Sequence, residues 1–203
     1  MIQYFLERPY LIVIMLAVIL LTLFVCVKAG QASAKRSKAN EAIIKKLKKE
    51  NELRREFAVL TEKTVANADE ARLFKGVALN LQKKISDASD MVSEFNELNE
   101  AQRDVYALSF VVEDGESALS SFFRANGQPL TGASLNAVKK LFDGEVSVVF
   151  EKEYNAFDSE NEDVSMIPDE IIVLDKKFAD SVSADEICRV AGRYIKENIG
   201  EFI

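Results

Sequence analysis

The chain has 203 residues, 48% of them hydrophobic, and a formal net charge of −7, which allows one membrane anchor and one folded domain of ordinary size. It contains no histidine, so the usual general base near neutral pH and the commonest metal ligand are both missing. Its two isolated cysteines, Cys26 and Cys188, and its lack of a Gly-rich phosphate loop exclude the common disulfide, zinc and nucleotide-binding patterns. We therefore predict a protein that is not an enzyme and uses no cofactor.

The charge is divided unevenly along the chain. Met1–Ser86 holds 16 Lys/Arg against 8 Asp/Glu, whereas Asp87–Ile203 holds 10 against 25. A basic front half and an acidic back half should meet different partners.

The first predicted element is an apolar run from Tyr10 to Val27, in which only Thr22 is polar. A helix of this length reaches about 27 Å, close to the ~30 Å hydrocarbon core of a bilayer. We predict a short extracytoplasmic N-terminus over residues 1–9 and a transmembrane helix over residues 10–28.

A cleaved signal peptide is the alternative to an anchor. Ala32-Ser33-Ala34 offers a cleavage site after Ala34, which would release an exported domain. The apolar run is longer than a signal core, however, and only Glu7 and Arg8 stand close before it. These features favour an anchor that is retained.

The charges that flank the apolar run predict its orientation. Arg8 alone precedes the run, and the cations that follow it closely are Lys28, Lys35, Arg36, Lys38, Lys45 and Lys46. Because the positive flank stays in the cytoplasm, we expect a protein of the inner (plasma) membrane with its N-terminus outside and its C-terminal domain in the cytoplasm.

Residues 29–101 are predicted to form a basic linker followed by long amphipathic helices. A polar linker ends at Ala39, a helix begins with Asn40 as its cap, and a second long helix carries an apolar stripe from Val77 to Phe95. The basic residues could bind anionic lipid, or they could belong to a solvated stalk whose charges only enforce topology. The candidate membrane-surface residues are Lys35, Arg36, Lys38, Lys45, Lys46, Lys48 and Lys49.

The remaining elements are also predicted to be helices, which makes the chain all-α: a transmembrane helix, a helical stalk and a C-terminal multi-helix domain. Gly144 closes a helix over 133–142, and the face of residues 146–157 fits a helix better than a strand. Pro168 opens the next helix, and Ser183 with Glu186 forms a capping box for the last. Cys188 lies beside the apolar face of that helix, as a small buried hydrophobe would.

Residues 102–203 resemble a bacterial all-helical family represented by a DNA-mimic protein, whose acidic surface engages a DNA-binding transcription factor. The likeness rests on "RDVYALSFVVEDGESALSSFFRANG" (103–127), "LDKKFADS" (174–181) and "YIKENIGEF" (194–202). The family carries a Gly-Gly pair and a glutamine where Ser117, Ala118 and Ser121 stand here. The resemblance implies an acidic all-helical domain over 102–203, with Phe122, Phe123, Phe178 and Tyr194 in its core.

Carboxylates on neighbouring helices can imitate the charge spacing of DNA, because a helix rises 1.5 Å per residue and duplex DNA carries one charge per about 1.7 Å. The candidate acidic protein-binding residues are Glu94, Glu97, Glu100, Glu113, Asp114, Glu116, Glu151, Glu153, Asp158, Glu160, Glu162 and Asp163. A solvated acidic face that only keeps the domain soluble is the alternative. The run "DSENED" fails as a calcium loop, since Asp163 stands where the loop needs glycine.

Together these features predict a single-pass membrane protein with a cytosolic module that binds a basic protein, such as a transcription regulator, and does not bind nucleic acid directly. The alternative function is a membrane scaffold or oligomerisation protein, in which the acidic domain is merely solubilising.

Overall fold

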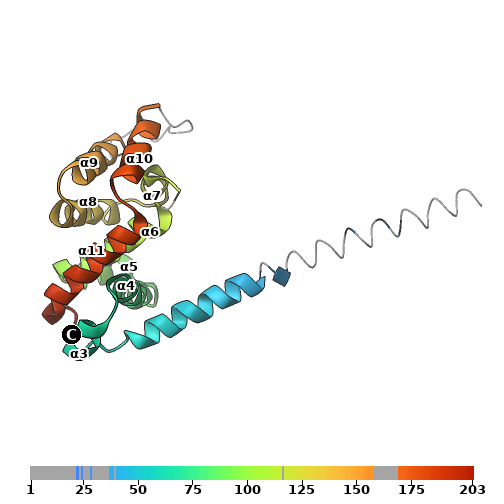
Figure 1. The fold of residues 1–203 in the computed structure, drawn as a ribbon, viewed down its shortest axis with the longest axis vertical. Coiled ribbons are helices and arrows are strands. Elements are labelled where there is room, and N and C mark those ends of the chain that lie inside the picture. Colours follow the sequence, from blue (N-terminus) through green and yellow to red (C-terminus); the bar gives the residue numbers. More distant parts are fainter. Residues whose placement is uncertain are drawn as a thin grey trace, which may run out of the picture. The chain divides into compact units, whose positions relative to one another are not determined.

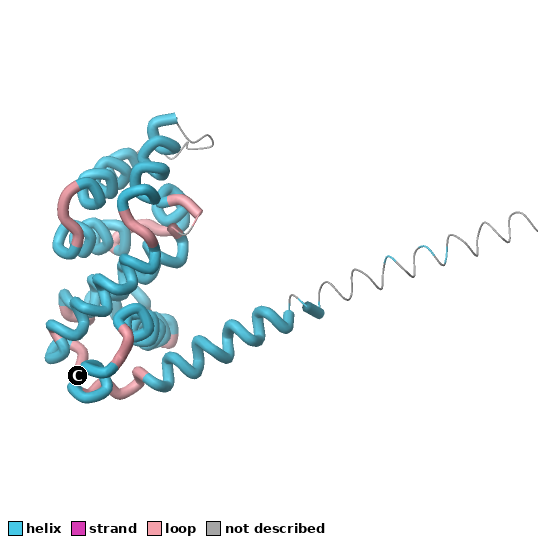
Figure 2. The backbone as a smooth tube through the Cα atoms, viewed as in Figure 1, coloured by secondary structure: helices cyan, strands magenta, loops and turns pink. Residues whose placement is uncertain are grey.

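The structure, a computed structural model, describes residues 22, 24, 28, 37–38, 40–115, 117–157 and 169–203. All regular secondary structure in these residues is helical, as Figure 2 shows. The all-α prediction is therefore confirmed. The chain divides into two compact units, Met1–Lys49 and Glu50–Ile203.

The described part of the first unit is an exposed amphipathic helix. Ser37, Lys38 and residues 40–49 are helical, so the helix begins before Asn40 and the prediction of Asn40 as its cap is wrong. Ile43, Ile44 and Leu47 form an apolar stripe on this helix, and each exposes more than half of its surface. Apolar side chains exposed in a row are characteristic of a surface that binds something else.

The predicted transmembrane helix over residues 10–28 lies outside the described residues, apart from Thr22, Phe24 and Lys28, which are helical. Within the described part of the chain, no helix has the combined length and apolar character that crossing a membrane requires.

The second unit is a layered assembly of short and medium helices around one hydrophobic core, shown in Figure 1. Its described elements are α3 (Glu62–Asn67), α4 (Glu70–Ser86), α5 (Met91–Glu97), α6 (Glu100–Asp114), α7 (Leu119–Ala125), α8 (Leu130–Leu141), α9 (Glu145–Phe157), α10 (Asp169–Ser181), α11 (Ala184–Glu197) and the 3-10 turn η1 (Ile199–Glu201). The core runs from Phe57 to Ile195, so the limits of this unit do not coincide with the predicted division between residues 101 and 102.

The closest helix pair in the second unit is α4 with α11. A Cβ atom at Gly192 in α11 would collide with the carbonyl oxygen of Glu70 in α4, so glycine is what lets the two backbones meet. On the same face of α11, Ile187, Ala191 and Ile195 are buried, as the apolar spacing of this helix predicts.

An aromatic cluster holds α7, α9 and α10 together. The ring centroid of Phe150 in α9 lies 5.2 Å from that of Phe123 and 6.2 Å from that of Phe122, both in α7. Phe178 in α10 completes the cluster at 6.0 Å from Phe150. These separations suit tilted aromatic pairs. The expectation that Phe122, Phe123, Phe178 and Tyr194 belong to the core is confirmed, since each is buried.

The predicted long helix from Val77 to Phe95 is wrong, because it is two helices, α4 and α5. The chain leaves α4 after Ser86, and Asp90 then starts α5 by accepting hydrogen bonds from the backbone N–H groups of Val92 and Ser93. A local aspartate cap of this kind offers the backbone an alternative to continued helix. Val92 is consequently exposed rather than part of the buried stripe.

Other local predictions are confirmed in part: α8 ends at its C-cap Phe142, before Gly144, the predicted capping box of α11 is present by its Ser183 half, and Pro168 lies outside the described residues. Residues 145–157 are helical, with Val149 and Phe150 on the buried face. Gly144, just beyond α8, adopts a φ of +69°, a backbone conformation that favours glycine. Ser183 caps α11 by accepting a hydrogen bond from the backbone N–H of Glu186.

Candidate functional site

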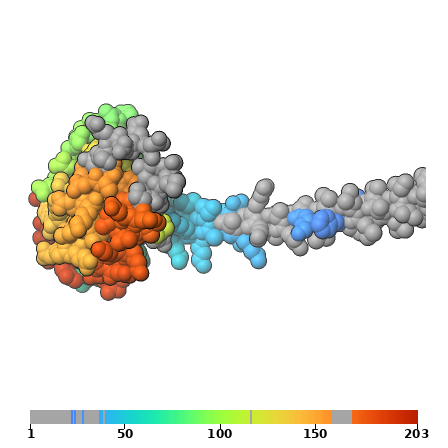
Figure 3. Space-filling model, turned by 90° about the horizontal axis from the view of Figure 1, so that it is seen from above, coloured from blue at the N-terminus to red at the C-terminus, as the bar shows by residue number. Residues whose placement is uncertain are grey.

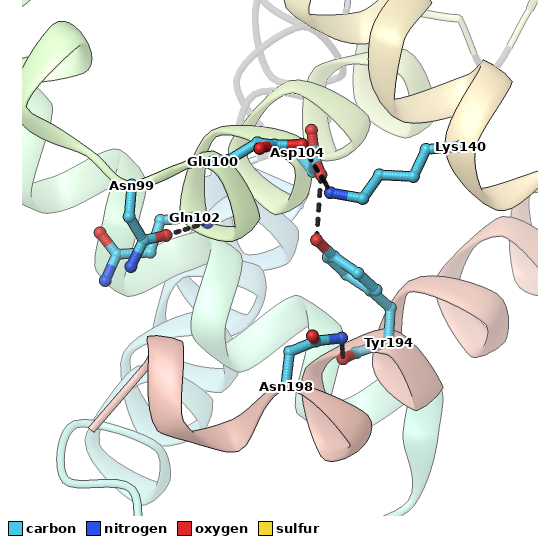
Figure 4. Close-up of polar contacts among 7 residues, drawn as sticks. All are labelled: Asn99, Glu100, Gln102, Asp104, Lys140, Tyr194 and Asn198. Carbon is cyan, nitrogen blue, oxygen red and sulfur yellow. Dashed lines mark hydrogen bonds and ion pairs between the residues drawn. The ribbon is translucent and has the colours of Figure 1, made fainter.

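A buried carboxylate, Asp104, joins three helices of the second unit. The Lys140 ammonium of α8 donates to Asp104 Oδ2 at 3.0 Å and to Glu100 Oε1 at 2.8 Å. The Tyr194 hydroxyl of α11 donates to the same Asp104 oxygen at 3.1 Å. The Lys140 ammonium also lies 5.2 Å from the centre of the Tyr194 ring, within cation–π range. Figure 4 shows Asp104 between these two donors.

The electrostatics of this cluster follow from its unequal burial. Burial raises the pKa of Asp104, although Lys140 and then Tyr194 act against that rise. Burial alone would lower the pKa of Lys140, but its hydrogen bonds with Glu100, Tyr194 and Asp104 outweigh that effect and raise it. The lysine is therefore charged at neutral pH, and it balances the buried carboxylate.

The start of α6 is tied to the chain terminus by a neighbouring set of hydrogen bonds, and Figure 4 shows the two side chains that make them, Asn99 and Gln102. Asn99 caps α6 by accepting from the backbone N–H of Gln102 at 2.8 Å. The side-chain amides of Asn99 and Gln102 both donate to the carbonyl oxygen of Glu201, each at 2.8 Å. These bonds fix η1 against α6, beside the Asp104 cluster.

A polar cleft of about 530 Å³ lies next to Asp104. Its wall includes Arg103, Asp104, Gln128, Asn136 and Lys140. Charges of both signs line it, so the cleft has no strong preference for a cation or an anion. No group of histidine, cysteine, aspartate or glutamate side chains in the described residues could hold a metal ion.

A second buried carboxylate, Glu153 in α9, has a different environment. Its exposed fraction is 0%, and neither of its carboxylate oxygens has a hydrogen-bond partner. Burial, and after it the neighbouring Asp175 carboxylate of α10, raise the pKa of Glu153 to about 8. Asp175 itself is well satisfied, since it accepts from the backbone N–H of Ser120 at 2.8 Å and from the Ser120 hydroxyl at 2.7 Å.

The burial of Glu153 corrects its predicted place on an acidic protein-binding surface. It lies on the apolar face of α9, four residues after Val149, and a partner protein cannot contact it in this fold. The prediction assigned Glu153 to the surface because of its charge, although position 153 falls on the helical stripe that packs into the core.

Most other described members of the predicted acidic set are exposed or half-buried, and several are paired. Glu94 pairs with Lys84, Glu100 with Lys140 and Glu151 with Lys139, which offsets part of their charge. The Gln82 side chain donates to Glu113 at 3.1 Å, and the Asn126 side chain donates to Asp114 at 2.8 Å. Glu97 is exposed. The predicted residues Glu116, Asp158, Glu160, Glu162 and Asp163 lie outside the described residues.

Some of the predicted membrane-surface residues also lie among the described residues and some do not. Lys38, Lys45, Lys46, Lys48 and Lys49 are exposed on the helix of the first unit, and Lys35 and Arg36 lie outside the described residues. The exposed lysines follow or flank the apolar stripe of Ile43, Ile44 and Leu47, the arrangement of a basic amphipathic helix.

The Asp104 cluster was not predicted from the sequence. Its signal is a charged residue on an apolar helical stripe: Asp104 falls between Ala101 and Leu108, both buried. The spacing alone does not reveal that Lys140 and Tyr194, from distant parts of the chain, reach the same oxygen.

Comparison with protein-family models, with curated proteins and with solved structures gave no match. The resemblance of residues 102–203 to a DNA-mimic family therefore stays a prediction that rests on its three motifs.

Proposed function

We propose that the chain is a single-span protein of the bacterial plasma membrane whose acidic helical unit binds a basic protein in the cytoplasm. The observation that carries the proposal is the division of charge between the two structural units. Residues 1–49 hold nine Lys/Arg against two Asp/Glu, and residues 50–203 hold 17 against 31. The units therefore carry net charges of +7 and −14.

The first unit supports the membrane half of the proposal. The uncharged run from Tyr10 to Val27 is long enough to cross a bilayer, and exposed lysines follow it on an amphipathic helix. Each basic residue near an anionic leaflet contributes about 1 kcal/mol of attraction. The lysines also oppose their own transfer across the membrane, which supports a cytoplasmic second unit.

The second unit supports the partner half of the proposal. A surface with net negative charge attracts basic proteins and repels nucleic acid and the anionic leaflet. Glu97 and Glu113 are exposed acids from neighbouring parts of the chain, and they are the strongest candidates for contact. A nucleic-acid-binding protein such as a transcription regulator has the matching positive surface.

Affinity capture of the full chain in detergent tests the proposal. We expect a basic protein to be retained from cytosol, and its retention to fall steeply as salt is raised. A double variant, Glu97→Gln with Glu113→Gln, should weaken retention. The matched control is Glu153→Gln, which makes the same side-chain change at a buried position and should leave retention unchanged. Retention that is indifferent to salt and to the Glu97→Gln, Glu113→Gln double variant would overturn the proposal.

Topology is tested separately by protease added outside intact cells. We expect the second unit to be protected and to fractionate with membranes. Digestion of the second unit from outside, or a soluble form that begins near Lys35, would show that the domain is exported.

A scaffold function is the second candidate, and the exposed stripe of Ile43, Ile44 and Leu47 favours it, because such a stripe can pair with a second copy. If Leu47→Asp abolishes self-association in sedimentation, and if deleting residues 103–203 leaves partner binding intact, the chain acts as a scaffold. Loss of partner binding on that deletion would favour the acidic module.

A further inference from the structure

The starting observation is Glu153, a fully buried carboxyl group that receives no hydrogen bond and has only the Asp175 carboxylate to which a proton on it could be donated. Leaving a buried polar group unsatisfied is costly, and leaving a buried charge unpaired costs much more. Most proteins avoid both, as this one does at Asp104. The neutral, protonated form of Glu153 is therefore the form that suits the folded structure.

The groups around Glu153 make its ionisation more unfavourable still. The helices that pack on α9 include α7, α8 and α10. From α10, the Asp175 carboxylate faces Glu153. From α8, Lys139 reaches α9 at Glu151 and pairs with that residue. From α7, Ser120 donates its hydrogen bonds to Asp175, and the charged residue of that helix, Arg124, is exposed.

Asp175 links this position to two helices at once. α7 lacks a side-chain cap of its own at Ala118, and Asp175 supplies one from α10 through the backbone N–H of Ser120. A movement of α10 that carries Asp175 away from Ser120 therefore also uncaps α7. Figure 3 shows α9 and α10 packed directly side by side on one face of the second unit.

We propose that the contact between α9 and α10 is a pH-sensitive latch, in which α10 opens from α9 with release of the proton from Glu153. In the closed state Glu153 is neutral beside Asp175. In the open state water reaches both carboxylates and Glu153 ionises. Opening exposes Ile171 and Phe178, which α10 otherwise buries. The latch is independent of the proposed partner binding.

The pH range follows from linkage. The closed state holds the Glu153 proton up to about pH 8, whereas an ordinary glutamate loses it near pH 4.5. Between these values opening releases one proton, so the open population rises about tenfold per pH unit. Below pH 4.5 Glu153 is protonated in both the closed and the open state, and above pH 8 it is ionised in both. The open population therefore stops changing with pH at each end of the range.

Amide hydrogen exchange of the full chain in detergent, normalised to the intrinsic rates, tests the latch. We expect the protection of α10 and of the first turn of α7 to fall about tenfold per pH unit from pH 5.5 to 7.5. Protection of α10 should stay below that of α4 and α11 throughout, because the opening is local. In Glu153→Gln the fall should disappear, and in the control Glu151→Gln it should persist.

Two results would overturn the latch. One is that the protection of α10 in the wild type does not change over this pH range. The same conclusion follows if the protection of α10 falls as steeply in Glu153→Gln as in the wild type. The other is equal protection of α10, α4 and α11 at every pH, which would mean that the helices open only by global unfolding. The wild-type profile is decisive even if the variant folds poorly, and the infrared band of a protonated buried carboxyl, lost in Glu153→Gln, provides an independent readout.

Discussion

Asp104 and Glu153 are two buried carboxylates in one helical unit, and their surroundings differ completely. Asp104 receives an ammonium at 3.0 Å and a hydroxyl at 3.1 Å, while Glu153 receives no hydrogen bond and faces another carboxylate. Burial raises the pKa of both, but Lys140 opposes the rise at Asp104 and Asp175 adds to it at Glu153. The surroundings of Asp104 stabilise a charged carboxylate, and the surroundings of Glu153 stabilise a protonated carboxyl group.

The comparison also has a functional meaning. The Asp104 cluster fixes α6, α8 and α11, and two of these helices, α6 and α11, pack on α4. The Glu153 region controls α10 and, through Asp175, the start of α7. Stability is thus concentrated in one region, and the capacity to respond to pH in the other.

The largest expected effect comes from Glu153→Gln. The pKa of Glu153 is about 8 in the folded chain and lies above its ordinary value of 4.5, so its stabilising contribution is present below pH 4.5 and is lost as pH rises to 8. The free energy of unfolding of the wild type should fall relative to the variant by about 1.4 kcal/mol per pH unit, about 5 kcal/mol in all. Urea denaturation at a series of pH values measures this, and parallel curves for the two proteins would refute it.

Removing the ammonium from the other carboxylate should have the next largest effect. Lys140→Met leaves Asp104 buried without its cation, and we expect a loss of about 3 kcal/mol of unfolding free energy at pH 7. The loss should shrink at lower pH, where Asp104 takes up a proton instead. A variant as stable as the wild type would show that the cluster does not stabilise the fold.

A smaller effect is expected from Tyr194→Phe, which removes one donor from Asp104 but keeps the ring over which Lys140 lies. A hydrogen bond to a charged group contributes about 1.5 kcal/mol. Thermal denaturation should show that loss in the wild-type background. In the Lys140→Met background the loss should be larger, because the hydroxyl is then the remaining donor, and strictly additive losses would argue against a shared cluster.

The smallest effect is expected at an exposed pair. Glu151, two residues from Glu153, pairs with Lys139 at the surface, where both side chains are more than 40% exposed. Glu151→Gln should change the free energy of unfolding by less than about 0.5 kcal/mol. A large change there would mean that position along α9, rather than burial, determines the effect at Glu153.

Much of the fold could be predicted from the sequence because helical spacing is a local property. The stripe of α11, its Ser183 cap and the glycine after α8 all follow from residues within one or two turns. The break between α4 and α5 was missed because the apolar spacing continues across it, and only the capping side chain of Asp90 ends the pattern.

The sites were harder to predict, because they depend on residues far apart in the chain. Asp104 and Glu153 share a recognisable signal, a carboxylate on an apolar stripe, and that signal identifies them as buried. It does not distinguish Asp104, which is paired with a lysine, from Glu153, which has no cation beside it. Lys140 pairs with Asp104 although the two are 36 residues apart. Helical spacing does not indicate which basic side chain will pair with a given carboxylate.

Titration of individual carboxyl groups by NMR, with isotope-labelled aspartate and glutamate, tests the contrast between the two regions most directly. Glu153 should titrate near pH 8 in the wild type, and Asp104 should titrate at a lower pH. If Glu153 instead titrates near its ordinary value of 4.5, it is ionised in the folded protein at neutral pH, and the contrast between a charged Asp104 and a protonated Glu153 is wrong.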